Sequence, residues 1–329
     1  DLGLDEDVSL NRHFFRLAHL GLLTEGVEMK EAELLGEIQA IFARPAKTNL
    51  SVPNGDDGAV FKSNKEVIAC ADVAVEGVHF KPEWSSLYEV GRKITAANLA
   101  DVCAMGGWPE FVLVTVVLPE KFVGSATELA KGIAFEADLV GAQVIGGDIS
   151  SGQQLSISIT AFGETSRPLL RSGAQVGDSI YVSHLPGLSA AGLALLTQGR
   201  VASSKIEERA ISQHKAPTID YLKYREGYAK LNSAIDISDG LVTDAGHIVV
   251  ASGVGIDLNS EALRGSELKE IDRERFLDWV LNGGEDHVLL GTSSEDVAGF
   301  IKIGRVFSGS GVTLDGNEIT AGGFSHSWK

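Results

Sequence analysis

The sequence predicts an α/β protein built from two domains. Its 329 residues are 44% hydrophobic, enough to bury a full core, and this length favours two domains over one. Apolar runs of strand length alternate with stretches of helical periodicity along the chain. After a leader at residues 1–28, we expect an N-terminal domain at 29–163 and a C-terminal α/β domain at 164–329.

The leader carries no chemical motif, although residues 11–23 have the pattern of a helix. Met29, at the start of the next predicted helix, is a candidate natural start of the chain. Residues 44–54 are polar and contain two prolines, which predicts a loop. This loop leads into the acidic pair Asp56 and Asp57, and mobile loops beside acidic sites often close over ligands.

The rest of the N-terminal domain is predicted to alternate strands and helices. Residues 59–61 and 67–71 are expected to form a strand pair, whose second strand is apolar on both faces and ends at Asp72. His79 follows in a predicted loop. Further elements are expected at these ranges: a helix at 87–105, a strand at 111–118, a helix at 125–140, a short strand at 142–145 and an alternating strand at 155–162.

Two features of this domain indicate chemistry. Gly146 and Gly147 precede Asp148 directly after a predicted strand, and two glycines let a backbone approach a phosphate closely. Asn98 and Asp101, three residues apart in a predicted helix, share one face. An alternative for the second pair is that both side chains are hydrogen-bonded polar residues of the core.

The C-terminal domain begins near Arg171, which could reach a phosphate, although an isolated arginine is usually a surface charge. Its predicted elements are strands at 179–182, near Ile256, at 301–306 and at 312–314, and helices at 188–196, 219–231 and 276–281.

The most informative stretch is S-A-I-D-I-S-D-G-L-V-T-D-A-G-H at residues 233–247, where an apolar run carrying Asp236 meets a turn and then a predicted helix from Leu241. Two carboxylates at such a junction are costly unless protonated, hydrogen-bonded or neutralised by a cation. Alternatively, Ser238 or Asp239 simply caps the helix.

The repeated occurrence of acids beside apolar segments favours cation binding over helix capping. Acids also stand beside apolar segments at Asp57, Asp72, Asp101 and Asp148, and helix capping does not explain the whole set. Because Mg²⁺ uses few carboxylates together with substrate phosphates, the pattern predicts a magnesium–nucleotide site.

Composition excludes other classes of function. The formal net charge of −17 argues against nucleic-acid binding, which needs an excess of Lys and Arg. Cys70 and Cys103 lack metal-ligand or disulfide spacing, so we expect reduced thiols in a cytoplasmic protein. The acidic N-terminus does not resemble a signal peptide. The apolar run at 111–118 is far shorter than the roughly 20 residues of a membrane helix.

Common nucleotide-binding signatures do not occur in the sequence. It contains no G-x-x-x-x-G-K-[ST], no G-x-G-x-x-G after a strand and no H-R-D loop. An EF-hand loop starting at Asp236 would need Gly and Glu where Leu241 and His247 stand. The residues alone therefore indicate several carboxylates around metal ions, with an unfamiliar way of binding phosphate.

Seven ordered motifs identify a family. N-G-D-D-G-A-V, A-D-V-A-V-E-G-V-H-F, A-A-N-L-A-D-V-C-A-M-G, V-I-G-G-D, R-S-G-A-Q-V-G-D, A-I-D-I-S-D-G-L and N-G-G-E-D together resemble the thiamine-monophosphate kinase family, from about Met29 to His326. That family belongs to the aminoimidazole ribonucleotide synthetase superfamily. The resemblance implies two α/β (α+β) domains with mixed sheets flanked by helices, ATP bound between them, and a homodimer formed through the first domain.

The resemblance also implies roles for individual residues. Asp72, Asp148 and Asp239 are expected to carry catalysis through the magnesium ions they hold. The full set of metal ligands would be Asp57, Asp72, Asp101, Asp148, Asp236 and Asp239. The contacts to ATP would be Gly147, Asp148, Arg171 and Ser238, and those to thiamine monophosphate would be His79, Glu285 and Phe324.

The sequence departs from the family pattern at some positions. Cys70 and Ala71 stand where hydroxyl residues are usual, so a metal contact there would use backbone carbonyl or water. G-E-D-H-V replaces the more usual G-E-D-Y-E, and Phe324 stands where Tyr is common.

The predicted activity is ATP- and Mg-dependent phosphorylation of thiamine monophosphate to thiamine diphosphate. Because the acceptor is already a phosphate anion, no strong general base is needed, and metal clamping with in-line positioning can suffice. One alternative is a superfamily enzyme that makes an acyl or iminophosphate intermediate. Another is a non-catalytic acidic metal-binding module that consumes no ATP.

Overall fold

The computed structural model of the chain describes residues 31–55 and 57–323, which divide into two compact units. The first unit contains the described residues up to Thr95 together with Glu110–Glu164, and the second contains Ala96–Pro109 and the chain from Thr165 onward. Each unit combines helices with a sheet, so the predicted α/β class is confirmed. The predicted helix at residues 11–23 lies outside the described residues.

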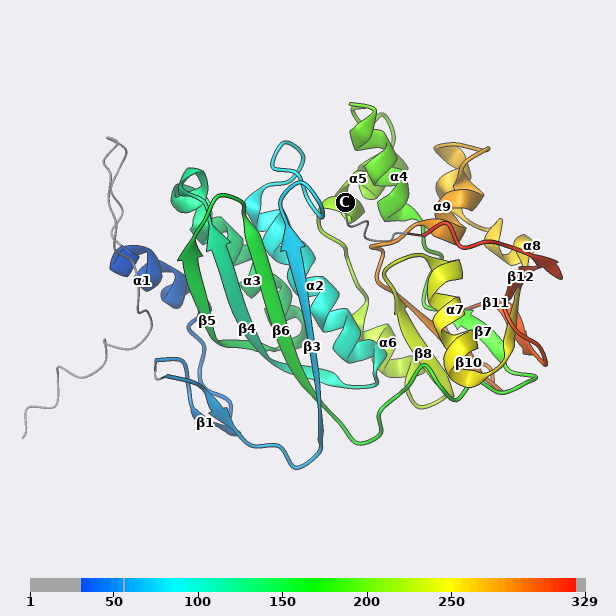
Figure 1. The fold of residues 1–329 in the computed structure, drawn as a ribbon, viewed down its shortest axis with the longest axis horizontal. Helices are drawn as coiled ribbons and strands as arrows, with labels where there is room; N and C mark the ends of the chain where they lie inside the picture. Colours follow the sequence, from blue (N-terminus) through cyan, green and yellow to red (C-terminus); the bar gives the residue numbers. More distant parts are fainter. Residues whose placement is uncertain (1–30, 56, 324–329) are drawn as a thin grey trace, which may run out of the picture. The chain divides into compact units, whose positions relative to one another are not determined.

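The first unit is built on a four-stranded sheet in the order β3-β6-β4-β5, one face of which is covered by α2 and α3 (Figure 1). A separate antiparallel pair, β1 and β2, precedes the sheet in the chain. The elements are α1 (Glu31–Phe42), β1 (Leu50–Val52), β2 (Val60–Phe61), β3 (Glu66–Val75), α2 (Leu87–Ala104), β4 (Trp108–Leu118), η1 (Glu120–Ser125), α3 (Ala126–Val140), β5 (Gln143–Ser151) and β6 (Ser156–Thr165).

The predicted pairing of the strands at 59–61 and 67–71 is wrong, because β2 pairs with β1 rather than with β3. The apolar β3 is an edge strand whose side chains include Val67 at 47% and Val73 at 50% exposure. Strand length and apolarity do not distinguish an edge from a centre, because both need β-branched residues.

Helices α2 and α3 cross at two glycines. A Cβ on Gly91 would lie 2.3 Å from the carbonyl oxygen of Leu129, and one on Gly132 would lie 2.0 Å from that of Tyr88. No side chain fits at such distances. The small residues of the predicted helix at 87–105 are therefore explained by close approach of two helix backbones.

Gly146, Gly147 and Asp148 lie inside β5 and not in a turn after it, which corrects the sequence prediction. β5 runs parallel to β4, with a register shift between Val112 and Leu113. A Cβ on Gly147 would lie 1.9 Å from the carbonyl oxygen of Val114. The neighbouring strand β4 therefore requires glycine at position 147, whether or not a phosphate binds there.

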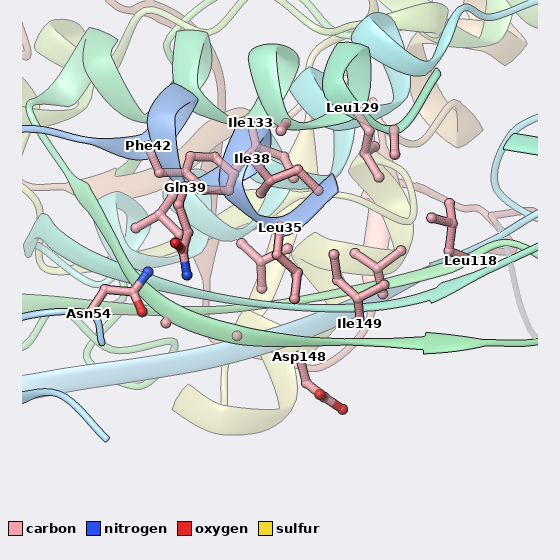
Figure 2. A pocket seen from close by; sticks show the side chains of 17 residues that line it. Leu35, Ile38, Gln39, Phe42, Asn54, Leu118, Leu129, Ile133, Asp148 and Ile149 are labelled. Carbon is pink, nitrogen blue, oxygen red and sulfur yellow. The ribbon is translucent and has the colours of Figure 1, made fainter. Parts of the chain in front are cut away.

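An apolar pocket lies between α1, α3 and the strands β4 and β5, with a cavity volume of about 70 Å³. Leu35, Ile38 and Ile149 point into it, whereas the Asp148 carboxylate points away to the other side of the sheet (Figure 2). Such a lining cannot neutralise a phosphate. The chemistry predicted for β5 therefore belongs to the opposite face.

The second unit contains a seven-stranded sheet in the order β13-β12-β9-β11-β7-β10-β8. β12 runs parallel to β9, whereas β8, β10, β7, β11 and β9 are successively antiparallel, so the sheet is mixed. Its elements are β7 (Ser179–Val182), α4 (Leu188–Thr197), α5 (Lys205–Lys215), α6 (Tyr221–Gly227), β8 (Ser233–Ile237), α7 (Leu241–Ser252), β9 (Gly255–Leu258), α8 (Ser260–Leu263), η2 (Glu267–Glu270), α9 (Phe276–Asn282), β10 (Val288–Ser293), β11 (Ile301–Phe307), β12 (Val312–Leu314) and β13 (Asn317–Glu318).

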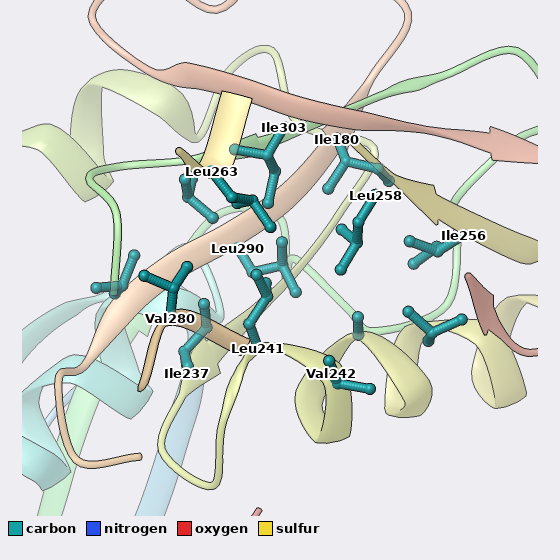
Figure 3. Close-up of a cluster of buried hydrophobic side chains, with 14 of the residues drawn as sticks. Ile180, Ile237, Leu241, Val242, Ile256, Leu258, Leu263, Val280, Leu290 and Ile303 are labelled. Atoms are coloured by element: carbon teal, nitrogen blue, oxygen red, sulfur yellow. The ribbon is translucent and has the colours of Figure 1, made fainter. Parts of the chain in front are cut away.

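A single apolar core covers one face of this sheet. Ile237, Leu290 and Ile180 from neighbouring strands meet Leu241 of α7 and Val280 of α9 (Figure 3). All five side chains are fully buried, at 0% exposure. The core fixes β8, α7 and β10 relative to one another, and these are the elements that carry the acidic stretch.

Helix α6 is shorter than the helix predicted at 219–231, and α5 was not predicted. Asp220 caps α6 by accepting a hydrogen bond from the Lys223 amide, so the helix cannot begin at Ile219. Among the described residues, no helix is long and apolar enough to cross a membrane.

The helix crossing gives a test of the first unit. We expect Gly132→Ala to lower the free energy of unfolding by about 1–3 kcal/mol, because the added methyl group must push α2 and α3 apart. Gly36→Ala is the matched control, since a Cβ there meets nothing within 4 Å and alanine should raise helix stability by roughly 0.5–1 kcal/mol. Chemical unfolding measures both. Equal stability of Gly132→Ala and the wild type would contradict the close crossing.

Candidate functional site

The predicted metal ligands are divided equally between the two units. Those of the first unit are Asp57, Asp72 and Asp148, and those of the second are Asp101, Asp236 and Asp239.

The first unit does not bring its acids together by itself. Asp72 lies inside β3 and not at its end, and Asp148 lies on β5. Two strands separate β3 from β5, which corresponds to about 14 Å across the sheet. Both side chains are exposed, as is Asp57 in the loop before β2.

His79 lies in the turn after β3, as predicted. Its Nδ1 accepts a hydrogen bond from the backbone N–H of Val75 at 3.0 Å. Because Nδ1 is the acceptor, the proton of the neutral ring is on Nε2. This hydrogen bond fixes the His79 ring relative to the end of the strand.

In the second unit, the pairing of β8 with β10 brings two distant motifs together. Val288 lies opposite Ile237 and Leu289 lies opposite Asp236. The S-D-G turn that follows β8 therefore lies beside the G-G-E-D-H segment that precedes β10. Backbone hydrogen bonds join them, from Glu285 N–H to the Ser238 carbonyl at 2.8 Å and from His287 N–H to the Ile237 carbonyl at 3.1 Å.

Close backbone contact explains the glycines of both motifs. A Cβ on Gly284 would lie 2.2 Å from the Ser238 carbonyl oxygen, and one on Gly240 would lie 2.8 Å from that of Asn282. Gly240 has a φ of 125° and is the N-cap of α7, without a side-chain cap. The alternative that Ser238 or Asp239 caps this helix is therefore wrong.

Asp244, which is not among the residues predicted for the site, holds the S-D-G turn. Its Oδ2 accepts hydrogen bonds from the N–H groups of Ser238, Asp239 and Gly240 at 3.0, 3.0 and 3.1 Å. Burial raises the pKa of Asp244 to about 7. The hydrogen bonds from the backbone lower this pKa, whereas the negative charges of Asp239 and Asp236 raise it further. The turn amides are thereby occupied and face a carboxylate, not a ligand.

Asp236 lies on the side of β8 opposite the apolar core. Its Oδ1 accepts a hydrogen bond from the Tyr224 hydroxyl at 2.9 Å, and its Oδ2 lies 2.8 Å from Nδ1 of His287. Burial alone would lower the pKa of His287, but the charge of Asp236 and the hydrogen bond to it outweigh burial and raise it to about 9. Asp236 therefore stabilises the protonated form of the His287 ring.

Further acids surround this pair. Asp101 and Glu285 both add to the negative potential at the His287 ring, which places the predicted ligand on α2 near β8 within this unit. Asn98, one turn earlier on α2, is fully buried. Each oxygen of Asp236 already has a protein partner, so a metal ion at this residue would share those oxygens.

Asp239 is better suited to a cation. No described residue donates a hydrogen bond to its half-buried carboxylate. Within the described part of the chain, one group of ligand-type side chains lies together: atoms of Asp239, Asp244 and His247 are within 4.8 Å of one another. Carboxylate oxygens are the donors that Mg²⁺ prefers. The donor set at this turn therefore fits a magnesium ion.

The remaining predicted residues lie outside this acidic cluster or at its edge. Arg171 is exposed, and its carbonyl accepts a hydrogen bond from Ser252. Phe324 lies outside the described residues. The chain before it reaches the S-D-G turn, since a Cβ on Gly323 would lie 2.2 Å from the Asp239 carbonyl oxygen. Glu285 is exposed by about a third on a backbone with a φ of 62°.

The chain is similar to known proteins over most of its length. Residues 55–165 match the family model described as AIR synthase related protein, N-terminal domain. A thiamine-monophosphate kinase of Aquifex aeolicus is 36% identical over 312 residues, which cover 91% of this chain and 100% of the relative. A thiamine-monophosphate kinase of Mycobacterium tuberculosis is 36% identical and covers 84% of this chain and 85% of its own length.

Solved structures of thiamine-monophosphate kinases are also similar to this chain. The crystal structure of a thiamine-monophosphate kinase from Stenotrophomonas maltophilia superimposes with a TM-score of 0.78 at 30% identity, covering 87% of this chain and 96% of the other. The structure described as AaThiL complexed with AMPPCP and TMP superimposes with a TM-score of 0.76 at 32% identity. It covers 93% of this chain and all of its own.

The role of Asp244 can be tested without a ligand. We expect Asp244→Ala to lower the free energy of unfolding by about 1–3 kcal/mol, because three backbone N–H groups lose their acceptor. Asp244→Asn keeps an acceptor oxygen and should stay close to the wild type. Chemical unfolding, with hydrogen exchange of the Ser238, Asp239 and Gly240 amides, measures both effects. If alanine and asparagine were equally stable and equally protected, Asp244 would not hold the turn.

Proposed function

Because the chain belongs to the thiamine-monophosphate kinase family, we infer that it transfers the γ-phosphoryl group of ATP to thiamine monophosphate. The products are thiamine diphosphate and ADP. The observation that carries this inference is the match to a thiamine-monophosphate kinase over 91% of this chain and all of the relative. The enzyme is therefore a phosphotransferase with a phosphate group as acceptor.

We propose that magnesium is the metal of this reaction. The carboxylate at Asp239, half-buried beside Asp244, supports this proposal. Bound magnesium would neutralise phosphate charge and favour in-line transfer. The proposed ligands, three from each unit, are Asp57, Asp72, Asp101, Asp148, Asp236 and Asp239.

The residues of the chain have positioning roles in this mechanism. The amides of the S-D-G turn are taken by Asp244, so the turn would act on phosphate through the Asp239 carboxylate and the Ser238 hydroxyl. We assign ATP contacts to Gly147, Asp148 and Arg171 in addition. No base is required, since the acceptor oxygen belongs to an ionised phosphate.

The organic part of the acceptor would be held by other residues. We assign it to His79, Glu285 and Phe324. Supporting observations are the fixed ring of His79 and the partly exposed carboxylate of Glu285. A carboxylate suits a substrate that carries a cationic ring and an amino group.

We also propose a homodimer in the cytoplasm. β3 leaves one edge of the four-stranded sheet open and exposes Val67 and Val73, and open apolar edges favour pairing with another chain. Sedimentation equilibrium would detect this dimer. Cys70 and Cys103 are not joined in a disulfide, as is usual for cytoplasmic proteins.

The acceptor distinguishes this activity from its rivals. We expect ADP release in the presence of Mg²⁺ to be stimulated by thiamine monophosphate and hardly at all by thiamine, whose neutral hydroxyl lacks both charge and a neighbouring base. ADP release is measured with each acceptor and with neither. Stimulation by neither would assign the chain to another activity of the superfamily, and equal rates with both would contradict a mechanism in which phosphate is the required acceptor.

Asp148 gives a test of the catalytic assignment. Asp148→Asn keeps the shape of an exposed side chain but removes its charge, so we expect kcat to fall on the order of a hundredfold with no change in the melting temperature. Ser150→Ala, two residues later on the same strand and also exposed, is the control and should keep full activity. Near-normal turnover of Asp148→Asn would mean that this acid is not catalytic.

A further inference from the structure

The side chains of His214, Ser189 and Glu285 meet beside the G-G-E-D-H segment. His214 and Ser189 have no role in the mechanism proposed above. Nδ1 of His214 lies 3.1 Å from the Ser189 hydroxyl and 3.5 Å from Oε2 of Glu285. His214 and Ser189 are buried, at 6% and 1% exposure. A proton on Nδ1 is within reach of both oxygens. The buried histidine is therefore in contact with one carboxylate oxygen of Glu285, a residue that is itself exposed by about a third.

The position of His214 is fixed by helix packing. α4 and α5 lie against each other so closely that a Cβ on Gly192 would be 2.0 Å from the Ala210 carbonyl oxygen. Gln213, beside His214 on α5, donates a hydrogen bond to the Asp286 carbonyl at 3.3 Å. Asp286 in turn accepts hydrogen bonds from the amides at the start of α4, Gly187 at 2.5 Å and Ser189 at 2.9 Å. The two helices are thereby attached to the segment that carries Glu285.

Glu285 itself depends on such support. Its backbone has a φ of 62°, a left-handed conformation that is unfavourable for a residue with a Cβ. Its side chain has three rotatable bonds, and fixing them in one conformation costs free energy each time a ligand binds. Contact of Oε2 with His214 restrains these bonds in advance.

We propose that His214, supported by Ser189, is a positioning residue for acceptor recognition: it holds Oε2 of Glu285 so that the carboxylate is preoriented toward the organic part of thiamine monophosphate. This inference rests on the proposed role of Glu285 in acceptor binding. The group recognised would be a hydrogen-bond donor or a cationic ring, both of which thiamine provides. Neither His214 nor Ser189 touches the substrate in this assignment.

The proposed role of His214 predicts a change in KM for the acceptor without a change in kcat. Restoring rotamer freedom to Glu285 weakens ground-state and transition-state binding alike, which raises KM and leaves kcat unchanged. We expect His214→Leu to raise KM for thiamine monophosphate about fivefold, in line with the rotamer entropy of a glutamate, and to leave KM for ATP unchanged. His214→Asn, which keeps a donor near the position of Nδ1, should restore most of the wild-type value.

A double-mutant cycle separates this role from a merely structural one. In a Glu285→Ala background, His214→Leu should have no further effect on KM, because the carboxylate it orients is absent. His184→Leu is the matched control. His184 is a largely buried histidine of the same unit whose Nδ1 contacts Ser183 at 3.4 Å, so its replacement should not change KM for the acceptor.

Two results would overturn the proposal. One is an equal rise in KM caused by His214→Leu with and without Glu285, and the other is a parallel rise in KM for ATP. Crystal structures of the free wild type and His214→Leu give a readout that needs no activity: Glu285 should be ordered in the first and change rotamer in the second. An unchanged rotamer would refute positioning, whereas absence of ADP release by the wild type would refute only the proposed function.

Discussion

The antiparallel pairing of β8 with β10 is the constraint on which the acidic end of the second unit depends. It sets the S-D-G turn beside the G-G-E-D-H segment through hydrogen bonds from the Glu285 and His287 amides. Ile235 and Ile237 point into the apolar core while Asp236 points to the other side. A slip of one residue would turn the carboxylate into that core and place the isoleucines beside the polar groups of Tyr224 and His287. The hydrophobic alternation of β8 therefore determines where the acid lies.

That arrangement contains several groups that are unfavourable on their own. Glu285 and His287 have φ values of 62° and 50°, which cost of order 1–3 kcal/mol each. Asp244 and Asp286 are buried carboxylates with pKa values raised to about 7 and 6 by burial. Each is held by backbone amides of a neighbouring element, and the large core on the other face of the sheet offsets the cost. Strain and buried charge are concentrated at the segment for which we propose a function.

The sequence predicted the fold class and the elements of regular periodicity, because apolar spacing reports directly on which side of an element is buried. It predicted poorly where the reason for a residue lies in a distant neighbour. Gly147 was interpreted as a turn near phosphate, yet the backbone of Val114 requires it. The strand at 59–61 pairs with β1 and not, as predicted, with β3, because apolarity does not reveal which strands are neighbours. The partners of Asp236, namely Tyr224 and His287, come from segments that only tertiary structure brings together. Asp244 gave one weak signal, an acid in the first turn of a helix, which does not predict three hydrogen bonds to a turn before it.

The electrostatics of the second unit bear on how an acidic enzyme can bind polyphosphates at all. A turn between a strand and a helix commonly binds phosphate through its amides, but here Asp244 accepts the hydrogen bonds of those at 238–240. The turn therefore offers a carboxylate to its ligand, and the chain as a whole carries a formal charge of −17. A free polyphosphate would be repelled by such a surface, whereas one that arrives with divalent cations would not. The same reasoning applies to an acceptor that is itself a phosphate. With the magnesium ions proposed above, a site of this kind would select for anionic substrates that share metal ions, and it would need no base to activate an oxygen that is already ionised.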